Sequence, residues 1–483
     1  MSLTYHSMFK QKNHFYITTT LPYVNADPHI GFALELIQAD VIARFKRSQG
    51  CEVFFNMGSD EHGVKIFRKA QEQHIDVQTY VNTYAAKFNN LKEALNVSYN
   101  NFIRTTDQHH VKAAQVFWLR CQKAGDIYKK NYQVKYCVGC ELEKTESELV
   151  DGKCPIHPNL QIEIIQEENY FFKYSNYQNP LLDFYKKHPD FVVPESRFRE
   201  IIEFTKRGLE DFSVSRVKEK MPWGVPVPGD ENHVMYVWFD ALIGYISALD
   251  WPNGERFKKF WPGMQVAGKD NLRQQSSMWQ AMLMSAGLKN STQIFIHGFI
   301  TSNGQKMSKS LGNVVDPFEL VKKYGSDAVR YYLLREIPST EDGDFSFEKF
   351  EQRYNGDLAG GIGNLLSRTV TLAAKVELKN STISSSVKKA VATAKKECAD
   401  QLNHFAFNEA LKVIWDLIGF CNKYINEQRP WENSAAAPQT IADVLFALEA
   451  IAELLQPFLP EAADKIAKAV IAKEPLALFP RLK

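Results

Sequence analysis

Apolar residues recur along this chain with two different periods. The run Phe15–Thr19 is strand-like, and the pattern after it places Leu34, Ile37, Val41 and Phe45 at three- and four-residue steps. Such steps put the four side chains on one face of a helix. A turn rich in Pro and Gly separates the two runs. The order strand, turn, helix is typical of a parallel α/β sheet.

The same alternation predicts the organisation of the whole chain. We expect an α/β fold with a doubly wound parallel sheet of the Rossmann type, interrupted by an insertion and followed by a C-terminal α-helical bundle. The predicted boundaries are 1–125 for the first half of the sheet domain, 126–212 for the insertion, 213–355 for the second half and 356–483 for the bundle. Expected strands of the second half are Val234–Phe239, Gln265–Ala267 and Ile294–Ile296. Bundle stripes are Leu411, Ile414, Ile418, Cys421, Ile425 and Leu445, Leu448, Ala452, Leu455.

Composition narrows the function classes only slightly. The 483 residues are 45% hydrophobic and 24% charged, with a formal net charge of +2. Any surface for nucleic acid must therefore come from local clustering of charge. No apolar run approaches the roughly 20 residues that span a bilayer, and Met1–His14 lacks the apolar core of a signal peptide. We expect a cytoplasmic protein without a membrane partner.

Three of the seven cysteines cluster. Cys137-Val-Gly-Cys140 is followed by Cys154-Pro-Ile-His157, which has the spacing of two knuckles around a tetrahedral Zn²⁺. A dithiol redox pair is the alternative, but it leaves Cys154 and His157 without a role. Four protein ligands leave no open position, so one structural zinc per chain is expected.

The segment Lys306-Met-Ser-Lys-Ser310 suggests phosphate chemistry. Lys306 and Lys309 carry ammonium groups, Ser308 and Ser310 carry hydroxyls, and flanking glycines allow the loop to close. A solvated surface loop is the plainer alternative. His29 and Gly31, at the predicted start of the first helix, lie where unpaired N–H groups favour a bound phosphate, although His29 alone could simply cap the turn.

Together these two segments resemble the His-Ile-Gly-His and Lys-Met-Ser-Lys-Ser signatures of class I aminoacyl-tRNA synthetases. The flanking residues narrow the resemblance to the methionyl-tRNA synthetase family. The matching motifs, in order, are Thr20–Asn25, Gly58–Gly63, Tyr236–Asp240, Gly268–Asp270, Ile296–Gly298, Lys306–Ser310 and Pro430–Trp431. Each motif alone is weak evidence for this family, but the occurrence of all of them in this order is specific to it.

The resemblance implies an activity and its reactants. Methionine would be activated by ATP, with Mg²⁺ on the phosphates, and then transferred to methionine tRNA. His29, Lys306 and Lys309 would be catalytic, because stabilising charge on phosphorus needs placed donors and no protein nucleophile. Gly31, Asp270, Ser308 and Ser310 would contact ATP.

Recognition of methionine needs an anion for its ammonium and a pocket for its thioether. By resemblance, Asp60 binds the ammonium, and the thioether pocket consists of Leu21, Tyr23, Trp238, Leu242, Tyr245 and Gln275. Aromatic faces suit a polarisable sulfur. On spacing alone, however, Trp238 and Tyr245 would be ordinary core aromatics. His109–His110 and Lys186–His188 are expected to be solvated surface.

Two positions depart from the family pattern. Phe32 stands where a second histidine is usual, which removes a phosphate donor, and Gln275 stands where a pocket histidine is usual but still offers a donor. One hypothesis is that the two changes compensate each other.

The helical region is expected to bind the RNA. By resemblance, Asn364, Arg368, Pro430 and Trp431 read the anticodon, since an indole stacks on an unpaired base and Asn and Arg address base edges. One turn of ordinary bundle helix is the plain alternative for Asn364–Arg368.

The chain ends soon after the bundle, so we expect a monomer. Three other functions remain: a synthetase for another amino acid, a silent RNA-binding relative, and a zinc-dependent interaction module.

Overall fold

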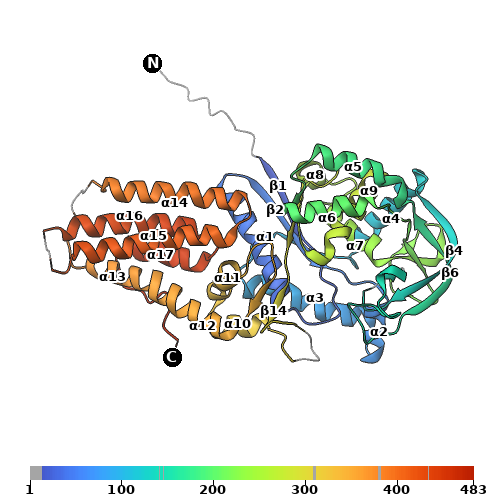
Figure 1. Cartoon of the computed structure of the whole chain (residues 1–483), viewed down its shortest axis with the longest axis horizontal. Helices are drawn as coiled ribbons and strands as arrows, with labels where there is room; N and C mark the ends of the chain where they lie inside the picture. Colours follow the sequence, from blue (N-terminus) through green and yellow to red (C-terminus); the bar gives the residue numbers. More distant parts are fainter. Residues whose placement is uncertain are drawn as a thin grey trace, which may run out of the picture. The chain divides into compact units, whose positions relative to one another are not determined.

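The computed structural model describes residues 13–140, 142–144, 146–307, 312–378, 382–432 and 435–482 (Figure 1). The chain folds into two compact units. The first contains Met1–Asp27, Lys46–Asn89 and Tyr99–Ile296, and the second contains Pro28–Phe45, Asn90–Ser98 and His297–Lys483. The described helices include none that is long and apolar enough to span a bilayer.

The first unit is built around a six-stranded sheet with the order β3–β2–β1–β12–β13–β7. Its strands are β1 His14–Thr19, β2 Glu52–Ser59, β3 Asn101–Arg104, β7 Val192–Val193, β12 Met264–Gly268 and β13 Gln293–His297. β1 pairs in parallel with β2 and β12, as do β2 with β3 and β13 with β7. Ile17, Phe55 and Val266 are fully buried, as expected where helices cover both faces. The predicted parallel sheet is confirmed, and the carboxyl ends of β1, β2 and β12 meet at one edge.

Helices pack around this sheet. Those of the first unit are α2 Val64–Glu72, α3 Val77–Ala94, α4 Gln108–Lys123, α5 Gln178–Lys187, α6 Glu195–Lys206, α7 Val237–Ser247, α8 Glu255–Phe260 and α9 Trp279–Ser285. Aromatic rings join α4, α7 and α9: the Phe117 ring lies 5.8 Å from Phe239 and 5.7 Å from Trp279. α7 is therefore held in the core of the unit.

The predicted strand Val234–Phe239 is wrong beyond its first residues. β11 (Asp230–Met235) pairs antiparallel with β9 (Ser215–Val217) and β10 (Pro226–Val227), outside the main sheet. The chain then turns at Tyr236 and enters α7. Because α7 is buried on almost every side, its apolar run lacks the amphipathic period that distinguishes a helix from a buried strand.

The insertion folds into an antiparallel sheet with the order β5–β4–β6–β8. Its strands are β4 Ile127–Cys137, β5 Leu142–Lys144, β6 Glu163–Phe172 and β8 Phe212–Ser213. β4 and β6 pair from Ile127↔Phe172 to Tyr136↔Glu163. The long hairpin presents the cysteine-rich segment at its far end.

The second unit is mainly helical and carries a small sheet of order β15–β14–β16. Its elements are α1 Ile30–Ser48, β14 Ile300–Ser302, β15 Gln305–Lys306, α10 Pro317–Tyr324, α11 Ser326–Arg335, β16 Gly343–Phe345, α12 Phe347–Arg353, α13 Asn364–Ala373, α14 Ser385–Asn403, α15 Phe407–Gln428, α16 Ala437–Leu455 and α17 Pro460–Ala472, with a π-helical turn at Tyr354–Gly363. α14 to α17 lie side by side (orange to red in Figure 1). Both predicted apolar stripes are buried, which confirms the bundle.

A buried guanidinium ties three segments of the second unit together. Arg330, on α11, donates to the backbone carbonyls of Phe458, Pro457 and Leu95, and forms an ion pair of 2.8 Å with Asp40 on α1. Burial opposes ionisation of Asp40, yet Arg330, Arg44 and Ser98 hold its pKa below the usual value. Breaking one partner of such a pair would leave a buried charge without compensation.

Candidate active site

The carboxyl ends of β1 and β2 bring the first group of predicted residues together. Beyond these strands the Asp60 N–H donates to the Pro22 carbonyl at 3.0 Å, and the Val24 N–H donates to the Asp60 carbonyl at 3.2 Å. Tyr23 and Asp60 thus form a parallel bridge. The Asp60 side chain is 5% exposed. The carboxylate predicted to bind an ammonium therefore lies beside Tyr23 at the edge where parallel sheets form ligand crevices.

α7 supplies the next three residues from one face. Trp238, Leu242 and Tyr245 are four and three residues apart, so their side chains project in the same direction. Leu21 packs on this helix, because a Cβ placed on Gly244 would lie only 2.5 Å from Leu21 Cδ1. The Trp238 indole N–H has no hydrogen-bond partner among the described residues. Leu21, two residues beyond the end of β1, is therefore in contact with α7 at Gly244.

Gln275 joins the same group through Tyr245. It lies in the π-helical turn Gln274–Met278, where its amide nitrogen donates to the Tyr245 hydroxyl at 2.6 Å. Its amide oxygen accepts from Gln265 at 3.1 Å. Gln275 is 1% exposed and held by neighbours on both sides. Compensation between Gln275 and Phe32 stays a prediction.

Asp270 lies at a different kind of position. It follows β12 in the short turn Lys269–Asn271, is exposed to solvent, and accepts from the Asn271 amide at 3.2 Å. An exposed carboxylate after a parallel strand is accessible to a ligand hydroxyl, but its predicted contact with ATP stays a prediction.

Sequence reasoning missed a buried cluster behind the pocket. Asp240 contacts the Nδ1 of His62 at 2.6 Å and the Nε2 of His110 at 2.7 Å. The expectation that His109–His110 is solvated surface is wrong for His110, which is 0% exposed, and holds for His109. Burial opposes the charge on Asp240, but the two histidines lower its pKa to about 2. Only the Asp60-Glu-His62 triplet hinted at this cluster, because no local pattern links it to His110.

The predicted phosphate site begins at the N-terminus of α1, in the second unit. The Gly31 N–H donates to His29 Nδ1 at 3.1 Å, and burial lowers the pKa of His29 to about 4. The ring is therefore neutral at pH 7. Since its Nδ1 accepts, its proton lies on Nε2, which is left as a donor. A Cβ at position 31 would lie 2.8 Å from His29 Cε1, so only glycine permits this fold of the ring.

Phe32 packs directly against this histidine. The two ring centroids are 4.7 Å apart at an interplanar angle of 42°. Phe32 therefore contributes to the burial of His29, a contact that the sequence did not predict. The phenyl ring offers no donor, but it borders the imidazole that does.

The Lys-Met-Ser-Lys-Ser segment follows a tight hairpin in the same unit. β14 and β15 pair antiparallel across Asn303 and Gly304, whose φ angles are 52° and 74°. Lys306 is exposed at the end of β15, while Ser308, Lys309 and Ser310 lie outside the described residues. The Ile30 N–H donates to the Val315 carbonyl at 3.1 Å. The start of α1 is thus bonded to the chain just beyond this segment.

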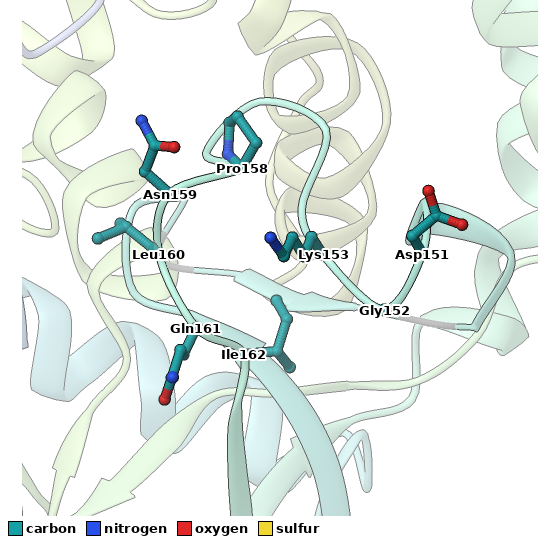
Figure 2. A pocket seen from close by; sticks show the side chains of 8 residues that line it. All are labelled: Asp151, Gly152, Lys153, Pro158, Asn159, Leu160, Gln161 and Ile162. Carbon is teal, nitrogen blue, oxygen red and sulfur yellow. The ribbon is translucent and has the colours of Figure 1, made fainter.

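The cysteine-rich knuckles form a compact cluster. Cys137, Cys140, Cys154 and His157 offer ligand atoms that all lie within 4.8 Å of one another, a group that could hold a metal ion. The Cys140 Sγ lies 3.5 Å from Cys154 Sγ and 3.2 Å from His157 Nδ1. A hollow of about 590 Å³ is lined by Asp151–Lys153 and Pro158–Ile162, the two segments that flank Cys154 and His157 (Figure 2). Cys154 and His157 thus each adjoin one wall of this hollow.

The predicted anticodon residues gather on one side of the bundle. The Arg368 guanidinium lies 5.8 Å from the Trp431 ring, which is 48% exposed. Arg368 also donates to Asn426 at 2.7 Å and to Asn422 at 3.4 Å, two amides that sequence reasoning missed. On α13, Asn364 is exposed one turn before Arg368, while the fourth predicted residue, Pro430, is buried next to Trp431.

Comparisons with known proteins agree with this fold. The family model "tRNA synthetases class I (M)" matches residues 15–161 and 146–370, and "Anticodon-binding domain of tRNA ligase" matches 387–480. The fold and the site thus define a class I tRNA synthetase. A "Methionine--tRNA ligase" from Thermosynechococcus vestitus is 44% identical, covering 94% of this chain and 89% of the relative, and one from Rhizobium meliloti is 43% identical, covering 94% and 90%.

Solved structures match the chain over nearly its whole length. Mycobacterium tuberculosis methionyl-tRNA synthetase in complex with methionyl-adenylate superposes with a TM-score of 0.92 at 37% identity, covering 97% of this chain and all of that one. The free form of the same enzyme gives a TM-score of 0.85 at 35% identity, covering 98% of this chain and 99% of that one. The chain belongs to the methionyl-tRNA synthetase family.

Proposed function

We propose that this chain is a methionine–tRNA ligase that works in two steps. The methionine carboxylate attacks the α-phosphorus of ATP, the bond to the bridging oxygen breaks, and pyrophosphate leaves with methionyl-adenylate remaining. The terminal ribose hydroxyl of methionine tRNA then attacks the activated carboxyl, and AMP leaves. The observation that carries the proposal is that one short segment both pairs with Asp60, through Tyr23, and packs on α7, through Leu21.

Methionine would lie between Asp60 and α7. The buried Asp60 carboxylate would accept hydrogen bonds from the substrate ammonium, which is a strong, charge-assisted interaction. Trp238, Leu242 and Tyr245, with Leu21 and Tyr23, would surround the thioether, and aromatic rings contact sulfur favourably. Gln275 would hold the Tyr245 hydroxyl, so that the ring keeps a fixed orientation.

ATP would bind at the start of α1. His29 would donate from Nε2–H to a phosphate oxygen, and Gly31 would let the phosphate approach the backbone. Lys306 and Lys309 would follow charge onto the departing pyrophosphate, and Ser308, Ser310 and Asp270 would contact the nucleotide. Mg²⁺ bound with ATP would neutralise part of the phosphate charge.

The cysteine cluster would hold one structural zinc. A tetrahedron with Zn–S of 2.3 Å and Zn–N of 2.0–2.1 Å has ligand–ligand edges of about 3.5–3.8 Å. The distances from Cys140 to Cys154 and His157, and the 3.8 Å from Cys137 Sγ to His157 Nδ1, fall close to this range. Four protein ligands leave no site for water, so zinc would take no part in catalysis here.

The tRNA would be read by the bundle. Trp431 would stack on an unpaired anticodon base, beside Pro430, and Arg368 and Asn364 would address base edges. Asn426 holds the Arg368 guanidinium in place.

The expectation of a monomer that acts in the cytoplasm stays a prediction. Static light scattering tests the oligomeric state, and cell fractionation tests the compartment.

Pyrophosphate exchange into ATP tests the proposal. We expect exchange that depends on methionine, with Mg²⁺ present and without tRNA, when methionine, leucine, valine and cysteine are compared. Best exchange with leucine, valine or cysteine would assign the chain to another amino acid. Tight tRNA binding without any exchange would make it a silent RNA-binding relative.

A further inference from the structure

Asp240 lies at the centre of a buried hydrogen-bonded cluster that no part of the proposed reaction uses. Its two carboxylate oxygens contact different histidines, His62 at 2.6 Å and His110 at 2.7 Å. Asp240 and His110 are 0% exposed, and His62 is 6% exposed. A carboxylate only accepts hydrogen bonds, so each histidine must direct an N–H at it. Such charge-assisted bonds are stronger and more directional than neutral ones.

One arm of the cluster holds the segment that carries Asp60. His62 is two residues after Asp60, and between them Glu61 accepts two bonds from Arg104, at 2.6 and 2.8 Å. The Glu61 carbonyl also accepts from the Trp223 indole N–H at 2.6 Å. The two residues that follow Asp60 are therefore both held by hydrogen bonds, which leaves the Asp60 backbone little freedom to move.

The other arm holds α7 from behind. Residues 238, 242 and 245 share one face of this helix, whereas residues 240 and 247 lie about half a turn away. On that rear face Asp240 contacts His110 Nε2, and the Ser247 hydroxyl contacts His110 Nδ1 at 2.8 Å. The His110 imidazole, on α4, thus forms hydrogen bonds with two residues of α7, Asp240 and Ser247, that lie about two helical turns apart. This contact fixes both the rotation and the axial position of the helix.

We infer that the His62–Asp240–His110 cluster sets the distance between the Asp60 carboxylate and the thioether-facing side of α7, and so selects amino acids by the length of their side chain. The inference rests on the proposed function. Asp240, His62 and His110 are positioning residues, because they act through Asp60 and α7 and do not touch the substrate. A site whose two ends are held at a fixed distance distinguishes homologues that differ by one methylene. A site whose ends can move apart or together distinguishes them less well.

Two homologues of methionine test this inference: S-methylcysteine, one methylene shorter, and ethionine, one methylene longer. In pyrophosphate exchange, one methylene typically changes kcat/KM by about 10–200-fold. In Asp240→Asn, one histidine would face an amide N–H₂ in place of an acceptor. We expect its discrimination against both homologues to fall by about tenfold, mainly because KM for methionine rises.

Two substitutions of His62 test the same inference in case Asp240→Asn does not fold. In His62→Asn the side-chain amide can donate from nearly the same place as Nδ1, whereas His62→Leu cannot donate. Discrimination should be largely kept in the first variant and lost in the second. Asp126→Asn is the matched control, because Asp126 is also a buried carboxylate of this unit but accepts from Ser285 and Tyr177. It should keep the discrimination of the unaltered chain.

The outcomes separate cleanly. If the unaltered chain shows no methionine-dependent exchange, the proposed function itself is wrong. If the unaltered chain is active but Asp240→Asn and His62→Leu lower kcat/KM by the same factor for all three amino acids, the cluster is merely structural and the inference fails. Unchanged discrimination in His62→Leu would overturn it as well.

Discussion

Removing the Phe32 ring should change the protonation of His29. The two rings are 4.7 Å apart, and burial lowers the pKa of His29 from an ordinary 6.5 to about 4. That difference corresponds to about 3 kcal/mol in favour of the neutral ring. An aromatic pair contributes about 0.5–1.5 kcal/mol beyond its buried area. We therefore expect Phe32→Ala to raise the pKa of His29 by up to about one unit, or ~1.4 kcal/mol.

The sign of the accompanying stability change follows from linkage. The folded pKa of His29 lies below its unfolded value, so the unfolded chain binds more protons between pH 6.5 and 4. The contribution of neutral His29 to stability is fully present above pH 6.5 and is lost as the pH falls through this window. In Phe32→Ala the lower limit of this pH range should move up, because the pKa of His29 in the folded protein rises.

Imidazole ¹⁵N NMR of the free protein measures this change directly. His29→Gln identifies the His29 resonances, and their shifts report both the pKa and the protonated nitrogen. Phe420→Ala, which removes a ring from the bundle far along the chain, is the control and should leave His29 unchanged. The reasoning would be refuted by a pKa that stays near 4 in Phe32→Ala, or by a neutral ring protonated on Nδ1.

Three further results are expected. Cys154→Ala should lose close to one zinc per chain by metal analysis, whereas the isolated Cys398→Ala should keep it; a folded, active and metal-free protein would contradict the zinc site. Trp431→Ala should weaken charging of methionine tRNA by about 1–3 kcal/mol while leaving exchange intact, and equal loss in both assays would make Trp431 structural. Phe32→His and Gln275→His should each impair exchange and together restore much of it; losses that simply add would show independent positions.

The sequence predicted the elements whose patterns are local. β1, α1, the bundle stripes and the cysteine knuckles were all recognised, because each has a fixed spacing set by a strand, a helix or a tetrahedral ion. The candidate pocket rested instead on the family resemblance, because by spacing alone Trp238 and Tyr245 would have been ordinary core aromatics.

The failures share one physical cause. α7 is buried on nearly all sides, so its apolar run was mistaken for a strand, and His110 was placed on the surface because its partners Asp240 and Ser247 lie on another element. The packing of Phe32 on His29 was missed for a related reason. Whether a ring at a helix start folds back onto its neighbour depends on tertiary surroundings, which no period along the sequence encodes.

The ion pair between Asp40 and Arg330 has a consequence for synthesis of the chain. α1 emerges from the ribosome early, yet the guanidinium that compensates its buried Asp40 is made much later. At about 5–20 residues per second, the gap is roughly 15–60 s. During that interval the nascent chain cannot complete the second unit, and α1 exposes residues that are buried in the folded protein. We expect nascent chains halted between α9 and α11 to be unusually sensitive to protease at α1 and to recruit chaperones that shield apolar helices.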